Sequence, residues 1–238
     1  MTAVLVTGAS RGLGLEMVRQ YAADGARVIA TCRNPAGSPE LAELRTRYPG
    51  KIRVEGLDVT DHARIDTLAR TLRNQPIDIL INNAGDIGPR DPDRTRLHEQ
   101  KFGTMNYAEW RRVLEINTLS PMKVAEAFVE QVAASALKRM VFVSSTTGSN
   151  VEGPYATFAY CSSKAALNKV VTMLAIALRP RGIACAAVCP GFVRTRLGGD
   201  RAVLGVEESI TGLRQVIAGL TLERTGSFTR YNGETIAW

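Results

Sequence analysis

Short runs of consecutive apolar residues alternate along the chain with longer segments in which apolar residues recur every three or four positions. The short runs are continuously apolar, which predicts strands buried on both faces, and the longer segments predict helices. The expected strands lie at residues 3–6, 27–31, 52–54, 77–81, 140–143 and 183–188, with a last one near Phe228. This alternation predicts an α/β fold with a doubly wound parallel sheet.

No linker, repeat or low-complexity tract interrupts the alternation, so residues 1–238 are expected to form a single domain. The apolar runs fall short of the roughly 18 residues that a membrane span requires, and we expect no membrane segment. The chain enters its first strand directly, without a basic segment ahead of a long apolar one. We therefore expect no signal peptide and a cytoplasmic location.

The formal net charge is +7, but the arginines are scattered and no nucleic-acid-binding motif accompanies them. This favours a solvated basic surface that attracts an anionic cofactor, and we expect no nucleic-acid partner. The four cysteines form no Cys-x-x-Cys pair, and neither His62 nor His98 is close to them in the sequence. We expect reduced, mostly buried cysteines and no metal site.

A glycine-rich turn, Thr7-Gly-Ala-Ser-Arg-Gly-Leu-Gly14, joins the first strand to a helix. Its glycines allow a tight turn and let the backbone approach a pyrophosphate at the helix N-terminus. Such a turn is also compatible with a plain strand-to-helix connection, but its place after the first strand favours a cofactor site.

The second strand ends in Thr31-Cys32-Arg33, where a chain that binds NAD normally has an acid for the ribose diol. No acid repels a 2′-phosphate there, and Arg33, together with Arg11, can pair with one. The sequence thus favours NADP(H), with a simple surface role for Arg33 as the alternative.

Other strand ends also carry polar or small residues. Asp58 either accepts a hydrogen bond from the adenine amino group or, like Thr60, caps the helix that starts near Asp61. The small residues of 82–85 let the backbone pass close to a ribose, and residues 86–105 are expected to form a polar surface excursion. Asn117 lies inside a predicted helix over 107–132, shortly before a proline, which indicates a local distortion.

Tyr160 and Lys164 lie four residues apart on a helix that we expect to begin near Ala159, so they project from one face. A phenol titrates near about pH 10, and a neighbouring cation favours its ionised form. A serine from the preceding strand end, Ser144 or Ser145, can hydrogen-bond a carbonyl while hydride reaches carbon and Tyr160 protonates oxygen. One interpretation of the Tyr160–Lys164 pair is therefore a site for carbonyl reduction. The alternative is that Tyr160 is simply a half-buried ring and Lys164 a solvated amine with no catalytic role.

Together these motifs resemble the short-chain dehydrogenase/reductase family, a group of Rossmann-fold enzymes. The resemblance covers essentially the whole chain: residues 7–14 match TGxxxGxG, 82–85 match NNAG, and Pro190-Gly191 with Thr195 match the nicotinamide clasp. Asn117, Ser145, Tyr160 and Lys164 match the catalytic tetrad. The opening and closing segments are most similar to C-factor and sniffer-type carbonyl reductases.

The resemblance implies a role for each matched residue. Tyr160 is the general acid in reduction and the base in reverse, and Lys164 holds the nicotinamide ribose and lowers the Tyr160 pKa. Ser145 orients the carbonyl, and Asn117 holds a water that links Lys164 to solvent. The residues expected to contact the cofactor are Gly8, Ser10, Arg11, Gly12, Leu13, Gly14, Arg33, Asp58, Val59, Asn83, Ala84, Gly85, Tyr160, Lys164, Pro190, Gly191, Val193 and Thr195.

One departure from the family pattern is the segment between Ser145 and Tyr160, which is two residues longer than is common. It leaves open which of Ser144 and Ser145 faces the substrate. Tyr155, Phe158 and Phe192 are expected to line the pocket.

The helix that carries Tyr160 has apolar residues on two sides, and the second stripe consists of Ala166, Val170, Met173 and Ala177. A helix that is apolar on both sides needs cover on both. In the family this face packs on a partner, which implies a homodimer or homotetramer; packing within one subunit is the alternative. The function expected is NADPH-dependent reduction of a small aldehyde or ketone, with a cofactor-bound signalling or regulatory protein as the second hypothesis.

Overall fold

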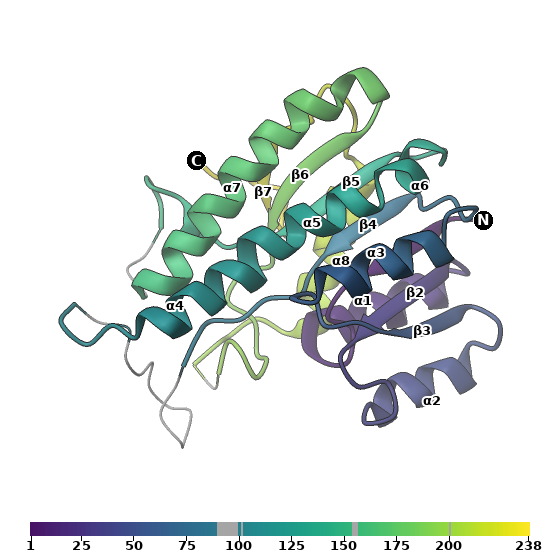
Figure 1. Ribbon diagram of the computed structural model, residues 1–238, viewed down its shortest axis with the longest axis horizontal. Coiled ribbons are helices and arrows are strands. Elements are labelled where there is room, and N and C mark those ends of the chain that lie inside the picture. Colours follow the sequence, from purple (N-terminus) through teal and green to yellow (C-terminus); the bar gives the residue numbers. More distant parts are fainter. Residues whose placement is uncertain (90–99, 101, 154–156, 200) are drawn as a thin grey trace.

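A seven-stranded parallel sheet forms the centre of the computed structural model, which describes residues 1–89, 100, 102–153, 157–199 and 201–238 (Figure 1). The strand order is β3-β2-β1-β4-β5-β6-β7, so the predicted doubly wound α/β fold is confirmed. The strands are β1 Ala3–Val6, β2 Arg27–Cys32, β3 Ile52–Gly56, β4 Ile79–Asn82, β5 Arg139–Val143, β6 Ala184–Cys189 and β7 Ser227–Arg230. Each expected strand is present, and the bounds differ by a residue or two.

Helices cover both faces of the sheet (Figure 1). They are α1 Gly12–Ala23, α2 Pro39–Arg47, α3 His62–Thr71, α4 Tyr107–Leu114, α5 Ser120–Ala127, α6 Val129–Ala133, α7 Phe158–Leu178 and α8 Val206–Ala218. Shorter helical turns are the π-helix η1 Glu115–Leu119 and the 3₁₀-helices η2 Thr146–Gly148 and η3 Arg179–Arg181. The expected helix over 107–132 is therefore interrupted, and its irregular part contains Asn117, as predicted.

Two buried clusters fill the space between the sheet and its helices. Val4 and Val6 of β1 belong to the cluster under α1, α2 and α8, whereas Leu5 between them belongs to the cluster under α3, α5 and α7. Successive side chains of a strand point to opposite faces, so a continuously apolar strand contributes to both clusters. This explains why the strands of the sequence show apolar runs without alternation.

The strand order reverses between β1 and β4, because β1 pairs with β2 on one side and with β4 on the other. At such a switch point the connecting segments leave in opposite directions, and a crevice opens at the carboxyl ends of the strands. The polar residues that follow β1, β4, β5 and β6 meet there.

The helix α7 is long and apolar enough, by length and composition alone, to cross a membrane. Its residues Leu167, Val171 and Leu174 are buried in the cluster under α3, α5 and α7. Core helices of globular proteins pass the same test, and packing against the sheet accounts for this composition.

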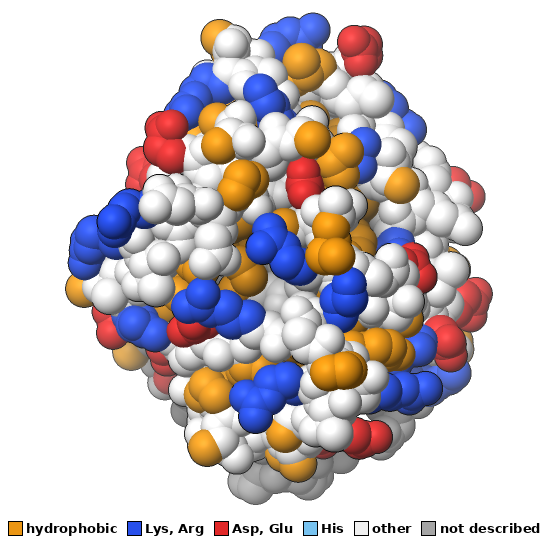
Figure 2. Space-filling model, turned by 90° about the vertical axis from the view of Figure 1, so that its right-hand side faces the viewer, with side chains coloured by type: hydrophobic (Ala, Val, Ile, Leu, Met, Phe, Trp, Pro, Cys, Tyr) orange, Lys and Arg blue, Asp and Glu red, His pale blue; other side chains and the backbone are white. Residues whose placement is uncertain are grey.

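Figure 2 shows the side of the molecule at the amino ends of the strands, where Lys and Arg side chains are interspersed with acidic and hydrophobic ones. Two expectations fall outside the part of the chain that the structure describes: most of the polar excursion over residues 86–105, and Tyr155 of the pocket lining.

Candidate active site

Tyr160 and Lys164 lie on the first turns of α7. Thr157 caps this helix by accepting a hydrogen bond from the Tyr160 backbone N–H at 3.3 Å. Both side chains are buried, at 9% exposed for Tyr160 and 4% for Lys164, and the Lys164 Nζ lies 5.7 Å from the centre of the Tyr160 ring. The two side chains share one face of the helix, as expected. Lys164 is buried, whereas the non-catalytic alternative required a solvated amine.

The two serines after β5 point in different directions. Ser144 is buried and donates its hydroxyl to Asn168 Oδ1 at 2.6 Å. Ser145 hydrogen-bonds the Tyr160 phenol and accepts from the Thr147 backbone N–H at 3.3 Å and the Thr147 hydroxyl at 3.0 Å. The geometry therefore places Ser145, rather than Ser144, next to the Tyr160 hydroxyl.

Burial has opposite effects on the two ionisable groups. It raises the pKa of Tyr160 above the usual range of a phenol, and the hydrogen bond to Ser145 opposes this rise. It lowers the pKa of Lys164 from 10.5 to about 8. The Lys164 Nζ donates to the Val143 carbonyl at 2.8 Å. The pKa of Tyr160 is therefore raised, not lowered as expected, because desolvation outweighs any stabilisation of the phenolate by Lys164.

Asn117 lies in η1, where the wider π-helical turn frees backbone groups and turns the amide inward. It is fully buried, and its Oδ1 accepts from the Asp86 backbone N–H at 2.9 Å. Its Nδ2 donates to the Asp86 carbonyl at 2.7 Å and to the Ser163 hydroxyl at 2.9 Å. A Cβ added to Gly85 would lie 3.3 Å from Asn117 Oδ1 and 3.7 Å from Lys164 Nζ. Asn117 and Lys164 of the tetrad therefore meet over Gly85.

The glycine-rich turn after β1 is held against the segment after β4. The Thr7 hydroxyl accepts from the backbone N–H groups of Asn83 and Ala84, at 3.0 and 3.1 Å. The Asn83 amide donates to the carbonyls of Thr7 and Gly8, at 2.8 and 3.2 Å. The side chain of Asn83 thus shapes the turn, which leaves its backbone for any contact with a cofactor.

Two glycines of this turn have no room for a side chain. Gly8 has a φ of +68°, and a Cβ there would lie 2.9 Å from the Ala84 Cα. A Cβ on Gly14 would lie 2.4 Å from the Gly8 carbonyl oxygen. Glycine is therefore required at both positions for the turn to pack against its neighbours, and the turn leads through Ser10, Arg11, Gly12 and Leu13 into the N-terminus of α1, where a pyrophosphate would bind.

The segment after β6 closes the other side of this turn. The Ser209 hydroxyl of α8 donates to the Pro190 carbonyl at 2.7 Å, and Gly191 has a φ of +81°. Thr195 accepts from the Gly198 N–H at 3.0 Å, and a Cβ added to Gly12 would lie 3.5 Å from the Thr195 Cγ2. Of the expected clasp, Pro190, Gly191, Val193 and Thr195, the structure brings Thr195 against Gly12 of the glycine-rich turn.

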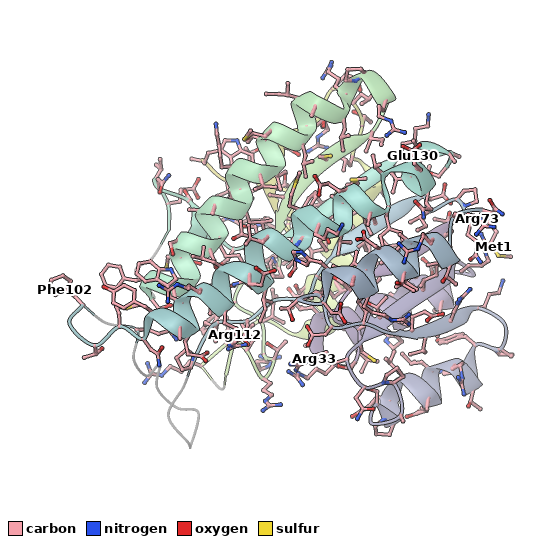
Figure 3. The ribbon with its side chains drawn as sticks, in the orientation of Figure 1. Met1, Arg33, Arg73, Phe102, Arg112 and Glu130 are labelled. Atoms are coloured by element: carbon pink, nitrogen blue, oxygen red, sulfur yellow. The ribbon has the colours of Figure 1, made fainter. Side chains whose placement is uncertain are left out.

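Arg33 follows β2 at the same edge of the sheet (Figure 3) and is exposed. None of the ion pairs among the described residues involves Arg33, so its guanidinium is available to an anion. Asp58 accepts from the backbone N–H and hydroxyl of Thr60, at 3.0 and 2.8 Å, and Val59 lies between them. Asp61 caps α3 by accepting from the Arg64 N–H, so the capping alternative for Asp58 and Thr60 is wrong.

Sequence reasoning missed several buried polar residues that support the site. Asn168 lies one helical turn after Lys164 and donates to the Gly148 carbonyl at 3.2 Å while it accepts from Ser144. Ser163 links Asn117 to the Tyr160 carbonyl, to which it donates at 2.7 Å. The signal was present: residues 160, 164 and 168 place three polar groups on one face of an otherwise apolar helix. No metal-binding group of His, Cys, Asp or Glu side chains occurs in the described residues.

The family model for the short chain dehydrogenases matches residues 2–202. The chain belongs to this family. The C-signal protein of Myxococcus xanthus is 37% identical over 166 residues, which cover 68% of this chain and 93% of that protein.

Solved structures of carbonyl reductases are similar over the whole chain. The NADPH-bound carbonyl reductase from chicken fatty liver is 30% identical with a TM-score of 0.89, and the match covers 100% of this chain and 99% of that one. The carbonyl reductase Sniffer of D. melanogaster is 28% identical with a TM-score of 0.89, and the match covers 100% of both chains.

Proposed function

We propose that this short-chain dehydrogenase is an NADP(H)-dependent reductase that converts the carbonyl of an aldehyde or ketone into an alcohol. The observation that carries the proposal is the meeting of Ser145, Tyr160 and Lys164 beside the glycine-rich turn that would hold the cofactor. A hydroxyl, a protonated phenol and a buried amine in this order are what a carbonyl needs to be polarised and then protonated.

The residues fit a dinucleotide. Gly8 and Gly14 keep the turn after β1 tight, because a Cβ on either would meet the backbone of Ala84 or of Gly8. The turn leads into the N-terminus of α1, where backbone N–H groups would bind the pyrophosphate. Arg33 would pair with the 2′-phosphate, since no acid occupies the end of β2 and no described carboxylate pairs with this side chain. When bound, NADPH supplies the hydride that reduces the carbonyl carbon. The NADPH-bound chicken reductase supports this choice of cofactor.

Ser145 and Tyr160 would both contact the substrate oxygen. Ser145 donates a hydrogen bond that orients the carbonyl, and Tyr160 delivers its proton as negative charge develops on that oxygen. Because burial raises the pKa of Tyr160, the phenol is protonated at neutral pH, which is the state that reduction requires.

Lys164 and Asn117 would complete the proton path. With a pKa of about 8, Lys164 is mostly protonated at neutral pH and stabilises the phenolate that remains after proton transfer. A water over Gly85 would be within reach of both Lys164 Nζ and Asn117 Oδ1. Such a water would return a proton to Tyr160 through Lys164.

The enzyme is proposed to act as a homodimer or homotetramer. Val170 packs against the core cluster under α3, α5 and α7, but Met173 and Ile176 are 59% and 76% exposed on the outer side of α7, and a second copy would cover this apolar surface. A molar mass of twice or four times 25.8 kDa in light scattering supports this proposal, and a monomer at micromolar concentration contradicts it.

A cofactor-bound signalling protein is the second candidate, and the identity to C-signal favours it. Catalysis distinguishes the two functions, because a signalling role has no need for a buried Tyr160–Lys164 pair.

The test is to incubate the purified protein with NADPH, and separately with NADH, and a panel of aldehydes, ketones, quinones and 3-oxoacyl thioesters. Oxidation of NADPH that depends on a carbonyl compound supports the reductase. Saturable NADPH binding without turnover of any class of carbonyl supports the signalling protein.

A further inference from the structure

Arg230, the last residue of β7, lies outside the catalytic tetrad but contacts both ends of the turn that begins at Ser145. Its Nη1 donates to the Thr146 hydroxyl at 3.1 Å, and Thr146 directly follows Ser145. Its Nη2 pairs with Glu152 Oε2 at 2.7 Å, at the far end of the same turn. One planar guanidinium therefore spans the segment that leads from Ser145 towards Tyr160.

The opposite side of the guanidinium is fixed by β7 and the segment after it. Arg230 Nε pairs with Glu234 at 3.3 Å, and its backbone N–H donates to the Glu234 carbonyl at 2.8 Å. β7 itself pairs with β6, where Arg230 is in register with Cys189. Arg230 is thus built on the sheet, and its position does not depend on the turn that it contacts.

Glu152 is held from two directions. Besides the ion pair with Arg230, its Oε1 accepts from the Ala237 backbone N–H at 2.7 Å, and its own N–H donates to the Ser149 hydroxyl at 2.9 Å. With side chains 29% and 32% exposed, the Arg230–Glu152 pair is shielded more than a typical surface pair. The carboxylate therefore ties the turn to the C-terminal segment.

The turn is packed so closely that a shift at either end moves Ser145. Thr146 is additionally in contact with the Cys189 sulfur, at 3.3 Å from its N–H and 3.2 Å from its hydroxyl. A Cβ on Gly153 would lie 2.8 Å from the Thr146 carbonyl, and one on Gly148 would lie 2.7 Å from the Lys164 carbonyl carbon. Close packing of this kind transmits displacement instead of absorbing it.

We infer that Arg230 and Glu152 are positioning residues: through Thr146 they hold the Ser145 hydroxyl in register with the Tyr160 phenol. This inference rests on the proposed reductase function. Neither side chain touches the reacting atoms, and both act by fixing the turn on the edge of the sheet.

The test compares Arg230→Met with Arg181→Met, which breaks a similar ion pair, to Glu130 at 2.8 Å, on the surface near the amino ends of the strands. In Arg230→Met, kcat for the carbonyl substrate is expected to fall about tenfold to a hundredfold, because small displacements of a reacting group cost that much. The affinity for NADPH is expected to stay within about twofold of the wild type, since Arg230 lies outside the cofactor cradle. Arg181→Met is expected to change neither quantity.

Two further variants separate positioning from general stability. Arg230→Lys keeps the charge for Glu152 but cannot hold both partners in one plane, so it is expected to recover part of the lost kcat. Glu152→Gln keeps an acceptor for the Ala237 N–H and removes the ion pair, so its kcat is expected to lie between that of Arg230→Lys and the wild type.

Hydrogen–deuterium exchange of residues 144–153 provides a readout that needs no substrate. Arg230→Met is expected to speed exchange in this segment and to leave that of β1 and β4 unchanged. Equal exchange and equal kcat in Arg230→Met and Arg181→Met would overturn the inference, as would a loss of NADPH affinity as large as the loss of kcat. If the wild type reduces no carbonyl, the reductase proposal fails, and the exchange comparison alone decides whether Arg230 holds the turn.

Discussion

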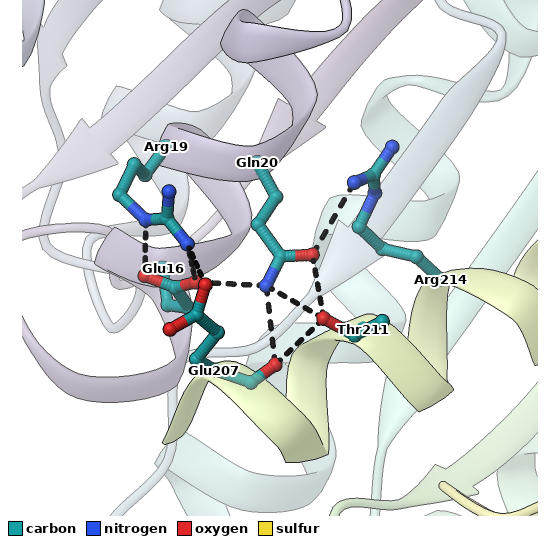
Figure 4. Close-up of polar contacts among 6 residues, drawn as sticks. All are labelled: Glu16, Arg19, Gln20, Glu207, Thr211 and Arg214. Carbon is teal, nitrogen blue, oxygen red and sulfur yellow. Dashed lines mark hydrogen bonds and ion pairs between the residues drawn. The ribbon is translucent and has the colours of Figure 1, made fainter. Parts of the chain in front are cut away.

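Two buried polar clusters, one around Gln20 between α1 and α8 and one around Lys164 at the carboxyl ends of the strands, differ in how many hydrogen bonds their central side chain makes. In the first, Gln20 is 6% exposed, and its amide N donates to Glu16, to the Glu207 carbonyl and to Thr211, at 2.7, 3.2 and 3.2 Å (Figure 4). Its amide O accepts from Arg214 at 3.2 Å. Each polar atom of the Gln20 side chain has a partner, and these hydrogen bonds join the two helices; the neighbouring Arg214 Nε is buried without one among the described residues.

In the second cluster a buried amine, that of Lys164, has few hydrogen-bond partners. Lys164 is 4% exposed, and its one hydrogen bond in the described structure goes to the Val143 carbonyl. Desolvation lowers the pKa of the amine to about 8. An interface is stabilised by complete pairing, whereas a catalytic site retains groups whose pKa values are perturbed and whose donors remain available. The comparison predicts that variants of the two clusters have opposite effects on stability and activity.

The largest effect is expected for Tyr160→Phe. Removal of a positioned proton donor lowers the rate by about 10²- to 10⁴-fold. The affinity for NADPH should stay within about twofold, since the ring is retained. Steady-state kinetics and a cofactor titration measure the two quantities.

The matched control for this substitution is Tyr21→Phe, which removes a phenol that is equally buried but lies on α1 beneath Arg214. It should retain the wild-type rate. A Tyr160→Phe enzyme as active as Tyr21→Phe would remove the basis for the catalytic assignment.

Lys164→Met should abolish turnover and stabilise the cofactor-free fold. A native pKa of about 8 against an ordinary value of 10.5 means that the buried charge costs of the order of 3 kcal/mol at neutral pH. The variant is therefore expected to unfold at higher urea concentration at pH 7, by about 1 to 3 kcal/mol once the lost hydrogen bond is included.

The pH dependence of this difference has a definite sign. Between pH 8 and 10.5 the native amine has lost its proton while the unfolded amine keeps it, so the unfolded state binds more protons. Wild-type stability therefore rises with pH relative to the variant, and the advantage of Lys164→Met should shrink across this window. A variant that is less stable than the wild type at pH 7 would show that Lys164 is satisfied in the fold.

Gln20→Ala should show the reverse pattern. It removes the hydrogen bonds of Gln20 to Glu16, Thr211 and Arg214, whereas Thr211 keeps the Glu207 carbonyl and Arg214 keeps Asp24, so the cost is about 1 kcal/mol of unfolding free energy. The kinetic constants should match those of the wild type, because the cluster is separate from the tetrad. Urea unfolding and steady-state assays on one preparation provide both values. A large fall in kcat without loss of stability would mean that the α1–α8 interface belongs to the site.

The sequence was sufficient for the fold and for the location of the site. Continuous apolar runs predicted every strand, and the spacing of Tyr160 and Lys164 predicted their shared face. Tertiary partners were not predictable in the same way: the Thr7–Asn83 hydrogen bonds join residues 76 apart, and the Arg230–Glu152 pair joins residues 78 apart. The direction of the Tyr160 pKa shift was predicted incorrectly, because it depends on burial, which residue spacing does not encode.

A fluorescence titration with NADPH and with NADH tests whether the site at the carboxyl ends of the strands binds NADP(H). It should be run on the wild type, on Arg33→Ala and on Arg73→Ala, which removes an exposed arginine near the opposite edge of the sheet (Figure 3). We expect saturable binding that prefers NADPH, and we expect this preference to be reduced about tenfold or more in Arg33→Ala, since a charged hydrogen bond is lost. Arg73→Ala should bind as the wild type does. Failure of the wild type to bind either cofactor, or an NADPH preference that survives in Arg33→Ala, would contradict the account.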